Sequence, residues 1–482
     1  MNNSKAPSIS KSQKIRTLIF IATASVAAFS GSLYGAPTLS GIELSSSTRL
    51  TTGETVTITG SGFGSKEQAA PVLYDHTDET WENGRPNKHQ SAFRDMALVQ
   101  RIDVDPDTIW AKPSVPEEHS TGMLVTNSRK SRTGDGGSHY YGKGNVNFLG
   151  WPKASGGEQT QYQSSKMYSA FWIKLPFDLT NYYAIPAERK PSAFITGGAE
   201  SYGEDVKIEG VDGVGRVIAY EANLGALPNG WLFFEPPRGV SIKDLTGKRV
   251  VGVDSGAEVL FPETSSLGKF DQNGFLSPRG KYARFWSDPS GTGYRFSLAN
   301  LGLAGTGSSI WANGFGSLSP TPGQWNLFEV EIDVGAEPSL VAWLNGKVYL
   351  ASDNDWATAF KSSSVSDSTG LTIALLGVDD FMPVPFTVEL DDIYLDKSLQ
   401  RVLLCNRSSI EEIRRVGAHC EVQRPSTWNE NKISLSLNMG SLDSSSDSIY
   451  LYVFDDRGLS NTKGWELNSV NAPLPPRDFQ AQ

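Results

Sequence analysis

Residues 328–334 read FEVEIDV, and this stretch decides the fold class. Apolar and acidic side chains alternate along it without a break, and successive side chains of a β-strand point to opposite faces. We therefore predict a strand whose apolar side chains lie on a core. The side chains of Glu329, Glu331 and Asp333 should face water.

The segment that follows has the signature of a β-hairpin. Residues 340–344 and 347–351 are apolar runs, and Asn345 and Gly346 lie between them. Asn-Gly favours the type I′ turn, whose two central residues need positive φ angles. The pattern predicts two antiparallel strands joined by a two-residue turn.

Similar short runs recur along the chain, separated by Gly, Pro, Asn and Asp. They predict strands at 167–174, 216–220, 230–235, 284–286, 295–298, 371–376, 386–395, 432–437 and 449–454. One helix is predicted over 408–415 (SSIEEIRR), where Ser408 with Glu411, or Ser409 with Glu412, forms a capping box. Many strands with little helix predict an all-β sandwich or jelly roll.

The charge balance excludes one class of partner. The chain has 482 residues, of which 43 are basic and 53 acidic, and a net charge of −10. Its first 36 residues contain basic residues and no acid, so the remainder is more acidic still. Because binding phosphates requires a basic field, we expect neither nucleic acid nor an anionic membrane surface as a partner.

Residues 1–36 have the three-part pattern of a signal peptide. Basic residues precede the apolar run 18–29 (LIFIATASVAAF), and small residues follow as far as Ala36. The run is shorter than the about 20 apolar residues of a membrane span, so we expect cleavage and export to the periplasm, the cell surface or the medium. A retained anchor is the alternative. No later segment is apolar enough to span a membrane, and residues 467–482 form a Pro-rich tail.

The chain has two cysteines, Cys405 and Cys420, and both lie in the part expected to be exported. An even count in an oxidising compartment predicts one disulfide, which closes a short loop. Two unpaired buried thiols are the alternative. A metal site is not expected here, because His419 is the one nearby histidine.

The start of the mature chain resembles an immunoglobulin-like domain of the TIG/IPT family. The resemblance is carried by residues 37–64, above all by 56–64 (VTITGSGFG), a strand that runs into a glycine turn. Segments in the order of the later TIG strands follow only near the other end, at 401–406, 427–437 and 449–458. We expect one discontinuous domain made of 37–68 and 398–466, although a separate small β module at 398–466 is the alternative.

The region between these segments, residues 69–397, resembles a concanavalin A-like (laminin G-like) jelly roll. The residues that carry the resemblance are 324–334 (QWNLFEVEIDV), 340–350 (LVAWLNGKVYL) and 386–396 (FTVELDDIYLD). The resemblance implies a jelly-roll domain inserted in, or flanked by, the TIG-like sandwich. That superfamily includes lectins, adhesion modules, glucanases and polysaccharide lyases, so the fold alone does not select a function.

Neither of two catalytic patterns of that superfamily assigns a catalytic residue in this chain. Its glucanases carry Glu-x-Asp-x-Glu on one strand, whereas 329–333 reads EVEID and ends in Asp, so a solvated strand face is expected instead. A lyase needs a cation and a Tyr or His for proton transfer, which 138–143 (SHYYGK) and 281–286 (KYARFW) contain. The longer, ordered motifs of the alginate lyases are absent, and a surface loop is the expected role of 138–143 beside its Gly-rich stretch. Nothing supports a Ser-His-Asp arrangement.

A glycan-binding face is predicted at Arg284, Trp286, Tyr294 and Arg295. These residues lie on two strands expected to be neighbours through the turn 288–293 (DPSGTG). Aromatic rings stack on the C–H faces of sugars, while arginines bind the hydroxyl groups. Core packing of the tryptophan is the alternative.

A structural Ca²⁺ is predicted at Asp75, Asp391 and Asp392. The alternation of residues 386–395 changes phase at the two aspartates, which predicts a β-bulge. Asp75 ends the first strand of the inserted domain, and first and last strands commonly pair in a jelly roll. In relatives of this fold such a pairing often holds Ca²⁺, an ion that prefers several oxygen ligands. Charges on an edge strand are the alternative.

The sequence thus predicts an exported bacterial protein that binds carbohydrate or a matrix partner through a lectin-like jelly roll. A polysaccharide lyase is the runner-up, and a structural subunit that contacts surface proteins is the third hypothesis. A cleft with converging Arg, Tyr and His would favour the lyase, a shallow face with Trp286 would favour the lectin, and a large apolar patch would favour assembly.

Overall fold

The computed structural model describes residues 35–45, 50–75, 81–82, 85–86, 99–100, 123–126, 132–133, 139–144, 147–149, 164–178, 182–187, 194–221, 230–240, 242–261, 281–286, 295–299, 302–306, 311–312, 320–333, 335, 339–351, 372–378, 386–415, 417–445 and 447–467. Except for Gly35, these residues belong to the compact unit Ala36–Gln482. Strands dominate the described residues, and the predicted all-β sandwich class is confirmed.

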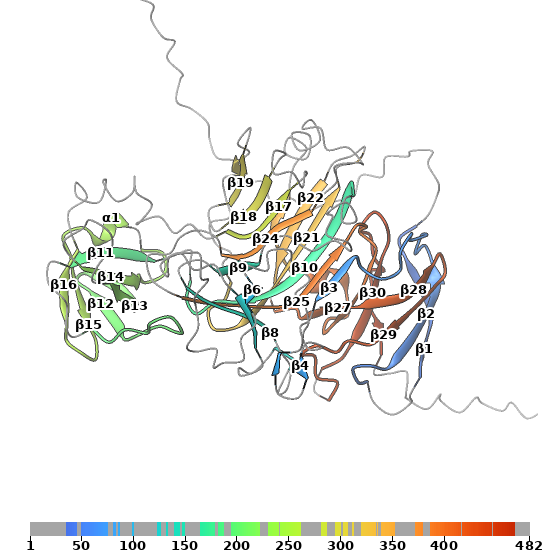
Figure 1. Cartoon of the computed structure of the whole chain (residues 1–482), viewed down its shortest axis with the longest axis horizontal. Coiled ribbons are helices and arrows are strands. Elements are labelled where there is room, and N and C mark those ends of the chain that lie inside the picture. Colours follow the sequence, from blue (N-terminus) through green and yellow to red (C-terminus); the bar gives the residue numbers. More distant parts are fainter. Residues whose placement is uncertain are drawn as a thin grey trace, which may run out of the picture. The chain divides into compact units, whose positions relative to one another are not determined.

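The sheet with the most strands, called here the β10 sheet, is formed by strands that lie between Leu73 and Asp396 in the sequence (Figure 1). Its strands, in spatial order, are β23 (Lys347–Ala351), β22 (Ser339–Leu344), β21 (Trp325–Asp333), β10 (Lys166–Lys174), β25 (Phe386–Asp396), β8 (His139–Gly144), β7 (Met123–Thr126) and β6 (Val99–Gln100). Strand β3 (Leu73–Asp75) also pairs with β25. A small separate hairpin joins β4 (Trp81–Glu82) and β5 (Arg85–Pro86).

Two further sheets contribute side chains to the same core as the β10 sheet. The β17 sheet contains β20 (Trp311–Ala312), β19 (Gly302–Thr306), β18 (Arg295–Ala299), β17 (Lys281–Trp286), β24 (Thr372–Val378) and β9 (Asn147–Leu149). The β13 sheet contains β11 (Tyr183–Ala187), β14 (Gly230–Glu235), β13 (Val211–Glu221), β12 (Asp205–Ile208), β15 (Arg249–Gly252) and β16 (Glu258–Leu260), and helix α1 (Ile242–Leu245) precedes β15.

The two ends of the chain meet in a second sandwich, called here the terminal sandwich. One of its sheets contains β1 (Thr38–Leu44), β2 (Thr55–Ser61), β29 (Lys432–Ser436) and β28 (Arg424–Asn429). The other contains β27 (Cys420–Val422), β26 (Arg401–Cys405), β30 (Tyr450–Phe454) and β31 (Trp465–Glu466). Figure 1 shows β2, drawn in blue, beside β29, drawn in red, and the two pair in register from Thr55 opposite Ser436 to Thr59 opposite Lys432.

Both sheets of the terminal sandwich enclose one core. It includes Val56, Ile58 and Phe63 from the first segment together with Leu404 and Ile433 from the second. The alternation of VTITG places its valine and isoleucine on this core, as a half-buried strand requires. Membership of the TIG family and the exact domain boundaries stay predictions.

In strand β21 the predicted apolar face lies on the core, but the prediction that its acidic face lies in water is wrong. Phe328 is fully buried and stacks on Phe171 of β10 with ring centroids 5.4 Å apart. The acidic face does not lie in water, because the terminal sandwich packs over it. Glu329 is only 1% exposed and pairs with Arg414 at 2.9 Å, and Glu331 pairs with the fully buried Arg401.

The predicted hairpin and the predicted bulge are both confirmed. Asn345 and Gly346 have φ angles of 49° and 78°, as a type I′ turn requires. A Cβ atom at position 346 would also collide with the carbonyl oxygen of Ile413. Glycine is therefore required there both by the positive φ angle and by the close approach of this carbonyl group. In β25 the register slips between Tyr394 and Asp391, and Asp392 adopts a φ of 45°.

Near the C-terminus the predicted disulfide and helix are present. Cys405 and Cys420 are directly opposite each other on β26 and β27 and form the disulfide. Helix α4 (Ile410–Ile413) is a single turn that begins at Ser409, whose Oγ accepts a hydrogen bond from the Glu412 N–H. Of the two capping pairs considered, the structure therefore contains Ser409 with Glu412.

No helix among the described residues is long and apolar enough to cross a membrane. Residues 1–34 and 468–482 lie outside the described residues, so the signal peptide, the Pro-rich tail and the exported location stay predictions.

Candidate functional site

The residues predicted to bind glycan lie on two paired strands of the β17 sheet. Trp286 of β17 is opposite Arg295 of β18, and Arg284 is opposite Ser297. Tyr294 and the side chains of the other three residues lie outside what the structure describes. The backbone thus brings three of the four positions together, and their role stays a prediction.

The aspartates predicted to bind Ca²⁺ are brought together by the pairing of β3 with β25, in which Asp75 is opposite Ile393. The Oδ1 atom of Asp391 accepts a hydrogen bond from the Asp392 N–H at 2.9 Å. The carboxylate of Asp392 accepts a hydrogen bond from the Tyr74 hydroxyl at 3.0 Å and pairs with Arg132. Among the described residues no three acidic, His or Cys side chains form a group suited to a metal ion. Arg132 therefore supplies the positive charge at Asp392, and Ca²⁺ stays a prediction.

The first of two clefts, called here the Tyr202 cleft, lies where the β13 sheet meets the ends of β10 and β21. It has a volume of about 560 Å³, within the range of about 300–1,000 Å³ that is usual for ligand sites. Its lining consists of Pro176, Glu200, Ser201, Tyr202, Val214, Gly215, Arg216, Glu235, Pro236, Arg238, Thr321, Pro322 and Gly323.

A tight loop before β12 carries Tyr202 into this cleft. The Gly203 N–H donates to the Val217 carbonyl at 2.6 Å, and the Glu204 N–H donates to the Ile195 carbonyl at 2.9 Å. The buried Glu204 carboxylate accepts hydrogen bonds from Ser255 and from the Ile195 N–H. Burial alone would raise the pKa of Glu204, but these hydrogen bonds lower it, so the loop is fixed by an ionised group.

The Tyr202 ring is held at its hydroxyl and along its face. The hydroxyl accepts a hydrogen bond from the Asp178 N–H at 3.0 Å and hydrogen-bonds with Glu235. The Arg216 guanidinium lies 5.1 Å from the ring centroid, a cation–π distance. The side chain of Arg216 is 56% exposed, and its nearest carboxylate, Asp205, is 3.7 Å away.

Burial and neighbouring carboxylates raise the pKa values of Tyr202 and of its partner Glu235. Burial raises the pKa of Glu235, and Asp178 raises it further, although Tyr202 and Arg216 act in the opposite direction. Burial and the hydrogen bond to Glu235 raise the pKa of the Tyr202 hydroxyl. The cleft therefore combines a neutral phenol with a carboxylate that accepts protons more readily than an exposed one.

A row of polar and aromatic side chains continues from the cleft across the β10 sheet. Tyr141 of β8, Glu389 of β25, Lys174 of β10 and Trp325 of β21 occupy successive positions directly opposite one another. Lys174 lies 3.3 Å from both carboxylate oxygens of Glu389, and His139 Nε2 lies 3.4 Å from one of them. We call this set, with His139, the Lys174 row.

The cleft and the row are joined by one hydrogen bond, which the Tyr141 hydroxyl donates to Glu200 of the cleft lining at 2.9 Å. Next to Glu200, the Ala199 carbonyl accepts a hydrogen bond from the Thr387 N–H of β25 at 3.0 Å. The side chain of Lys174 is 31% exposed, whereas His139 and Tyr141 are fully buried.

One further cluster of nucleophile, base and acid fails a geometric test. His419 Nε2 lies 2.7 Å from Glu421 Oε1 and 3.2 Å from Ser441 Oγ. A Ser-His-acid relay requires the serine and the acid at opposite ring nitrogens, and here both face the same one.

Sequence reasoning named part of this region and missed the rest. His139 and Tyr141 lie in the segment 138–143 considered for a lyase, and the strands that carry Arg216 and Glu235 were predicted as strands. No motif distinguished Tyr202, which is positioned by a loop and by two partners, Asp178 in the segment after β10 and Glu235 of β14.

Comparisons with known proteins leave the family open. No protein-family model and no curated protein matches the chain. Among solved structures, the chain has 13% identity and a TM-score of 0.24 to a cellulose induced protein, Cip1, over 68% of this chain and 97% of that one. It has 9% identity and a TM-score of 0.24 to an endo-β-1,4-glucuronan lyase of the fungus Trichoderma reesei, over 68% and 95%. The binding domain of Paraclostridial Mosquitocidal Protein 1 matches with 10% identity and a TM-score of 0.22, over 75% and 71%. Similarities at this level assign no function.

Proposed function

We propose that the protein binds carbohydrate in the Tyr202 cleft. The observation that carries the proposal is the fixed Tyr202 ring, held by Asp178, Glu235 and Arg216 in a cleft of about 560 Å³. An aromatic ring in a cleft with a few converging polar groups is the usual composition of a sugar site.

The charged groups of the cleft suit hydroxyl groups as ligands. Arg216 and Arg238 supply N–H donors, and Glu200 and Glu235 supply acceptors, so both hydrogen-bonding roles of a sugar hydroxyl have a partner. The positive and negative side chains of the lining balance, which favours a polyhydroxylated ligand over a simple ion. An exported protein, as the N-terminal sequence predicts, would meet such polymers outside the cell.

The test is retention of the purified mature protein on a panel of neutral and acidic polysaccharides in affinity electrophoresis. We expect Arg216→Gln to weaken retention at least about tenfold, because a hydrogen bond to a charged group contributes about 1.5–3 kcal/mol. Tyr202→Ala should do the same by removing the ring.

The matched control is Arg249→Gln. Arg249 is equally exposed and belongs to the same sheet, but it pairs with Glu258 outside the cleft. Retention of all variants equal to that of the wild type would contradict the proposed site. If no polysaccharide retains the protein, the proposal of carbohydrate binding fails, and contact with a surface protein becomes the better hypothesis.

A second candidate function is eliminative cleavage of an acidic polysaccharide, and the Lys174 row favours it. A lyase needs a base for the C5 proton, an acid for the leaving oxygen and a cation opposite the uronate carboxylate. Tyr141, His139 and Lys174 have these chemistries, and Tyr141 donates a hydrogen bond to Glu200 of the cleft lining. Tyr141 and His139 are fully buried, so cleavage also requires that the polymer gain access to them.

Cleavage is separated from binding by ultraviolet absorbance of the unsaturated uronate product in the same samples. Absorbance that grows with wild type and is lost in both Tyr141→Phe and Lys174→Met would make the protein a lyase. Retention without any product would leave binding as the function.

A further inference from the structure

A second cleft, called here the Tyr74 cleft, lies between the terminal sandwich and β25. It has a volume of about 620 Å³. Its lining consists of Thr52, Gly53, Thr55, Ala70, Tyr74, Thr133, Asp392, Arg424, Pro425, Ser426, Leu435, Ser436, Leu437 and Asn438. Strands β2, β28 and β29 supply a wall rich in hydroxyl groups, and Tyr74 of β3 and Asp392 at the bulge of β25 supply the other wall.

Tyr74 is fixed at the junction of the two walls. Its hydroxyl donates to Asp392 Oδ1 at 3.0 Å and accepts from Asn438 Nδ2 at 2.9 Å. Its ring packs edge-on against Tyr394, with centroids 6.3 Å apart, and the Arg424 guanidinium lies 5.7 Å from its centroid. The aromatic ring is thus preorganised before any ligand arrives, which lowers the entropic cost of binding.

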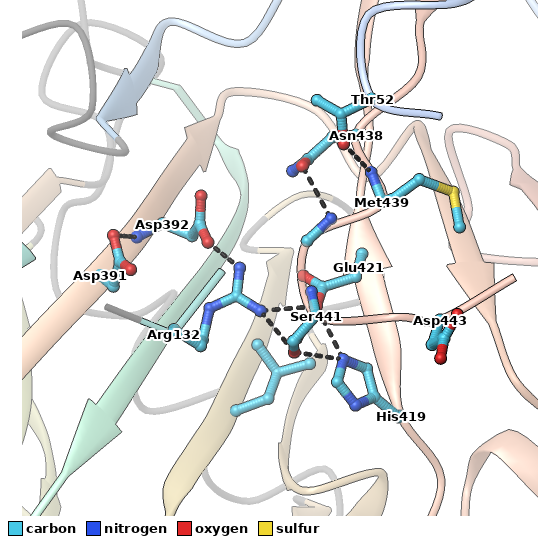
Figure 2. A network of polar contacts seen from close by, with 12 residues as sticks. Thr52, Arg132, Asp391, Asp392, His419, Glu421, Asn438, Met439, Ser441 and Asp443 are labelled. Atoms are coloured by element: carbon cyan, nitrogen blue, oxygen red, sulfur yellow. Dashed lines mark hydrogen bonds and ion pairs between the residues drawn. The ribbon is translucent and has the colours of Figure 1, made fainter. Parts of the chain in front are cut away.

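The negative charge of Asp392 is compensated from inside the protein. Figure 2 shows Arg132 between Asp392 and Glu421, and the guanidinium also donates to Ser441 Oγ at 3.2 Å. Arg132 lies 2.5 Å from Glu421 and 4.4 Å above the Trp172 ring, and only 1% of its side chain is exposed. A ligand in the cleft therefore does not need to neutralise Asp392.

Glu421 keeps the network charged at neutral pH. Its burial would raise its pKa, but Arg132 and His419 hold the pKa at about 2. The Glu421 carboxylate also accepts the Ser441 N–H at 3.0 Å and lies so close to Gly440 that a Cβ atom there would collide with it. The position of Arg132, and through it that of Asp392, is consequently fixed.

The second charged residue of the lining has the opposite environment. Arg424 is exposed, and it forms no ion pair with any residue that the structure describes. Hydroxyl groups of Thr52, Thr55 and Ser436 lie along the same cleft. The lining therefore offers one uncompensated guanidinium, one fixed aromatic ring and a row of hydroxyl groups.

We propose that the Tyr74 cleft is a second ligand site, and that it binds an acidic sugar unit such as a uronate. The carboxylate would pair with Arg424 in the bidentate geometry that guanidinium favours, the ring of Tyr74 would contact the C–H face, and the threonine and serine hydroxyls would bind the sugar hydroxyls. An inorganic anion would use Arg424 and leave the ring and the hydroxyls without a partner. This inference does not depend on the Tyr202 cleft.

The test is isothermal titration calorimetry of the full mature chain with a galacturonate trimer. The variants are Arg424→Gln, Arg216→Gln in the Tyr202 cleft, and the matched control Arg415→Gln, an exposed arginine that lines neither cleft. In the Arg216→Gln background we expect the trimer still to bind, and the further change Arg424→Gln to weaken it at least about tenfold. Arg415→Gln should leave binding unchanged.

Three outcomes would overturn the inference. They are unchanged binding in Arg424→Gln, equal binding of neutral maltotriose at the Arg424-dependent site, and full competition by sodium sulfate at the same concentration as the trimer. The two clefts also fail separately. Trimer binding lost only through Arg216 would support the proposed function and remove this site. Trimer binding lost only through Arg424 would support this site, and the proposed function would then depend on retention of the protein by the polysaccharide panel.

Discussion

The Tyr202 cleft and the Tyr74 cleft each hold a tyrosine beside an exposed arginine, and they differ in the arginine that acts on the carboxylate partner of the tyrosine. In each, a tyrosine hydroxyl contacts a carboxylate, Glu235 in one and Asp392 in the other. Glu235 faces the mostly exposed Arg216, and its pKa is raised by burial. Asp392 pairs with Arg132, which is almost completely buried.

The difference shows how burial of the cation decides the behaviour of the acid. Water screens an exposed guanidinium, so it compensates a half-buried carboxylate only in part. The buried guanidinium of Arg132, together with His419, keeps Glu421 ionised, as its pKa of about 2 indicates. We therefore expect the charge of the Tyr202 cleft to change with pH through Glu235, and the charge of the network beside the Tyr74 cleft to stay constant near neutral pH.

The largest expected effect is the loss of stability on removing Arg132. Arg132→Ala leaves Glu421 and Asp392 as buried, uncompensated charges, and we expect the free energy of unfolding to fall by about 3–5 kcal/mol. Urea denaturation measures it. Arg249→Ala, which breaks the exposed pair with Glu258, should cost no more than about 1 kcal/mol. Similar losses in the two variants would show that burial does not distinguish the pairs.

The disulfide should contribute nearly as much as Arg132 to the free energy of unfolding, and it too lies next to the network of the Tyr74 cleft. Cys405 and Cys420 are 15 residues apart, and a loop of that length is worth about 3 kcal/mol. Cys420 precedes Glu421, so the Cys405→Ser/Cys420→Ser double variant should also weaken the Arg424-dependent binding of the galacturonate trimer. Binding of polysaccharide in the Tyr202 cleft should persist. Thermal melting and calorimetry on the same samples check both expectations.

Acid should act on the network of the Tyr74 cleft through Glu421. Its folded pKa of about 2 lies below the ordinary value of 4.5, so the ionised form stabilises the fold above that ordinary value. The stabilisation is lost as the pH falls from about 4.5 towards 2. The difference in unfolding free energy between wild type and Glu421→Gln should therefore shrink over that interval, and a constant difference would contradict the lowered pKa.

The smallest effect is expected at Glu235, with the opposite sign. Its pKa is raised in the folded protein, so its contribution to stability is present at low pH and is lost as the pH rises through the folded pKa. Glu235→Gln removes the charge and should raise Tm slightly at neutral pH, with no gain in acid. A loss of Tm at neutral pH would show that the ionised carboxylate is stabilising.

Local patterns were sufficient for the parts of the fold that depend on neighbouring residues. The Asn345-Gly346 turn, the bulge at Asp392 and the apolar face of β21 each follow from a short-range rule of turns or alternation. The burial of Glu329 and Glu331 did not follow, because Arg414 and Arg401 come from a distant part of the chain. The local sequence of a strand with alternating acids is the same whether water or arginines from a distant segment cover those acids.

The same limit applies to the candidate sites. Residues 138–143 were singled out by composition, and the structure places His139 and Tyr141 beside Glu389. Tyr202 and Arg132 carry no motif, and their roles depend on Asp178, Glu235 and Glu421, which lie in other strands or loops. The predicted positions on β17 and β18 are paired by the backbone, and their glycan role is still to be tested.

Hydrogen–deuterium exchange with a retained polysaccharide tests the central claim, that carbohydrate occupies the Tyr202 cleft, most directly. We predict slower exchange in peptides that cover Gly215 and Arg216 and in those that cover Pro236 and Arg238, with unchanged exchange at Arg249 and Glu258 on the same sheet. Protection confined to other parts of the chain, or no protection in the presence of a polysaccharide that retains the protein, would contradict it.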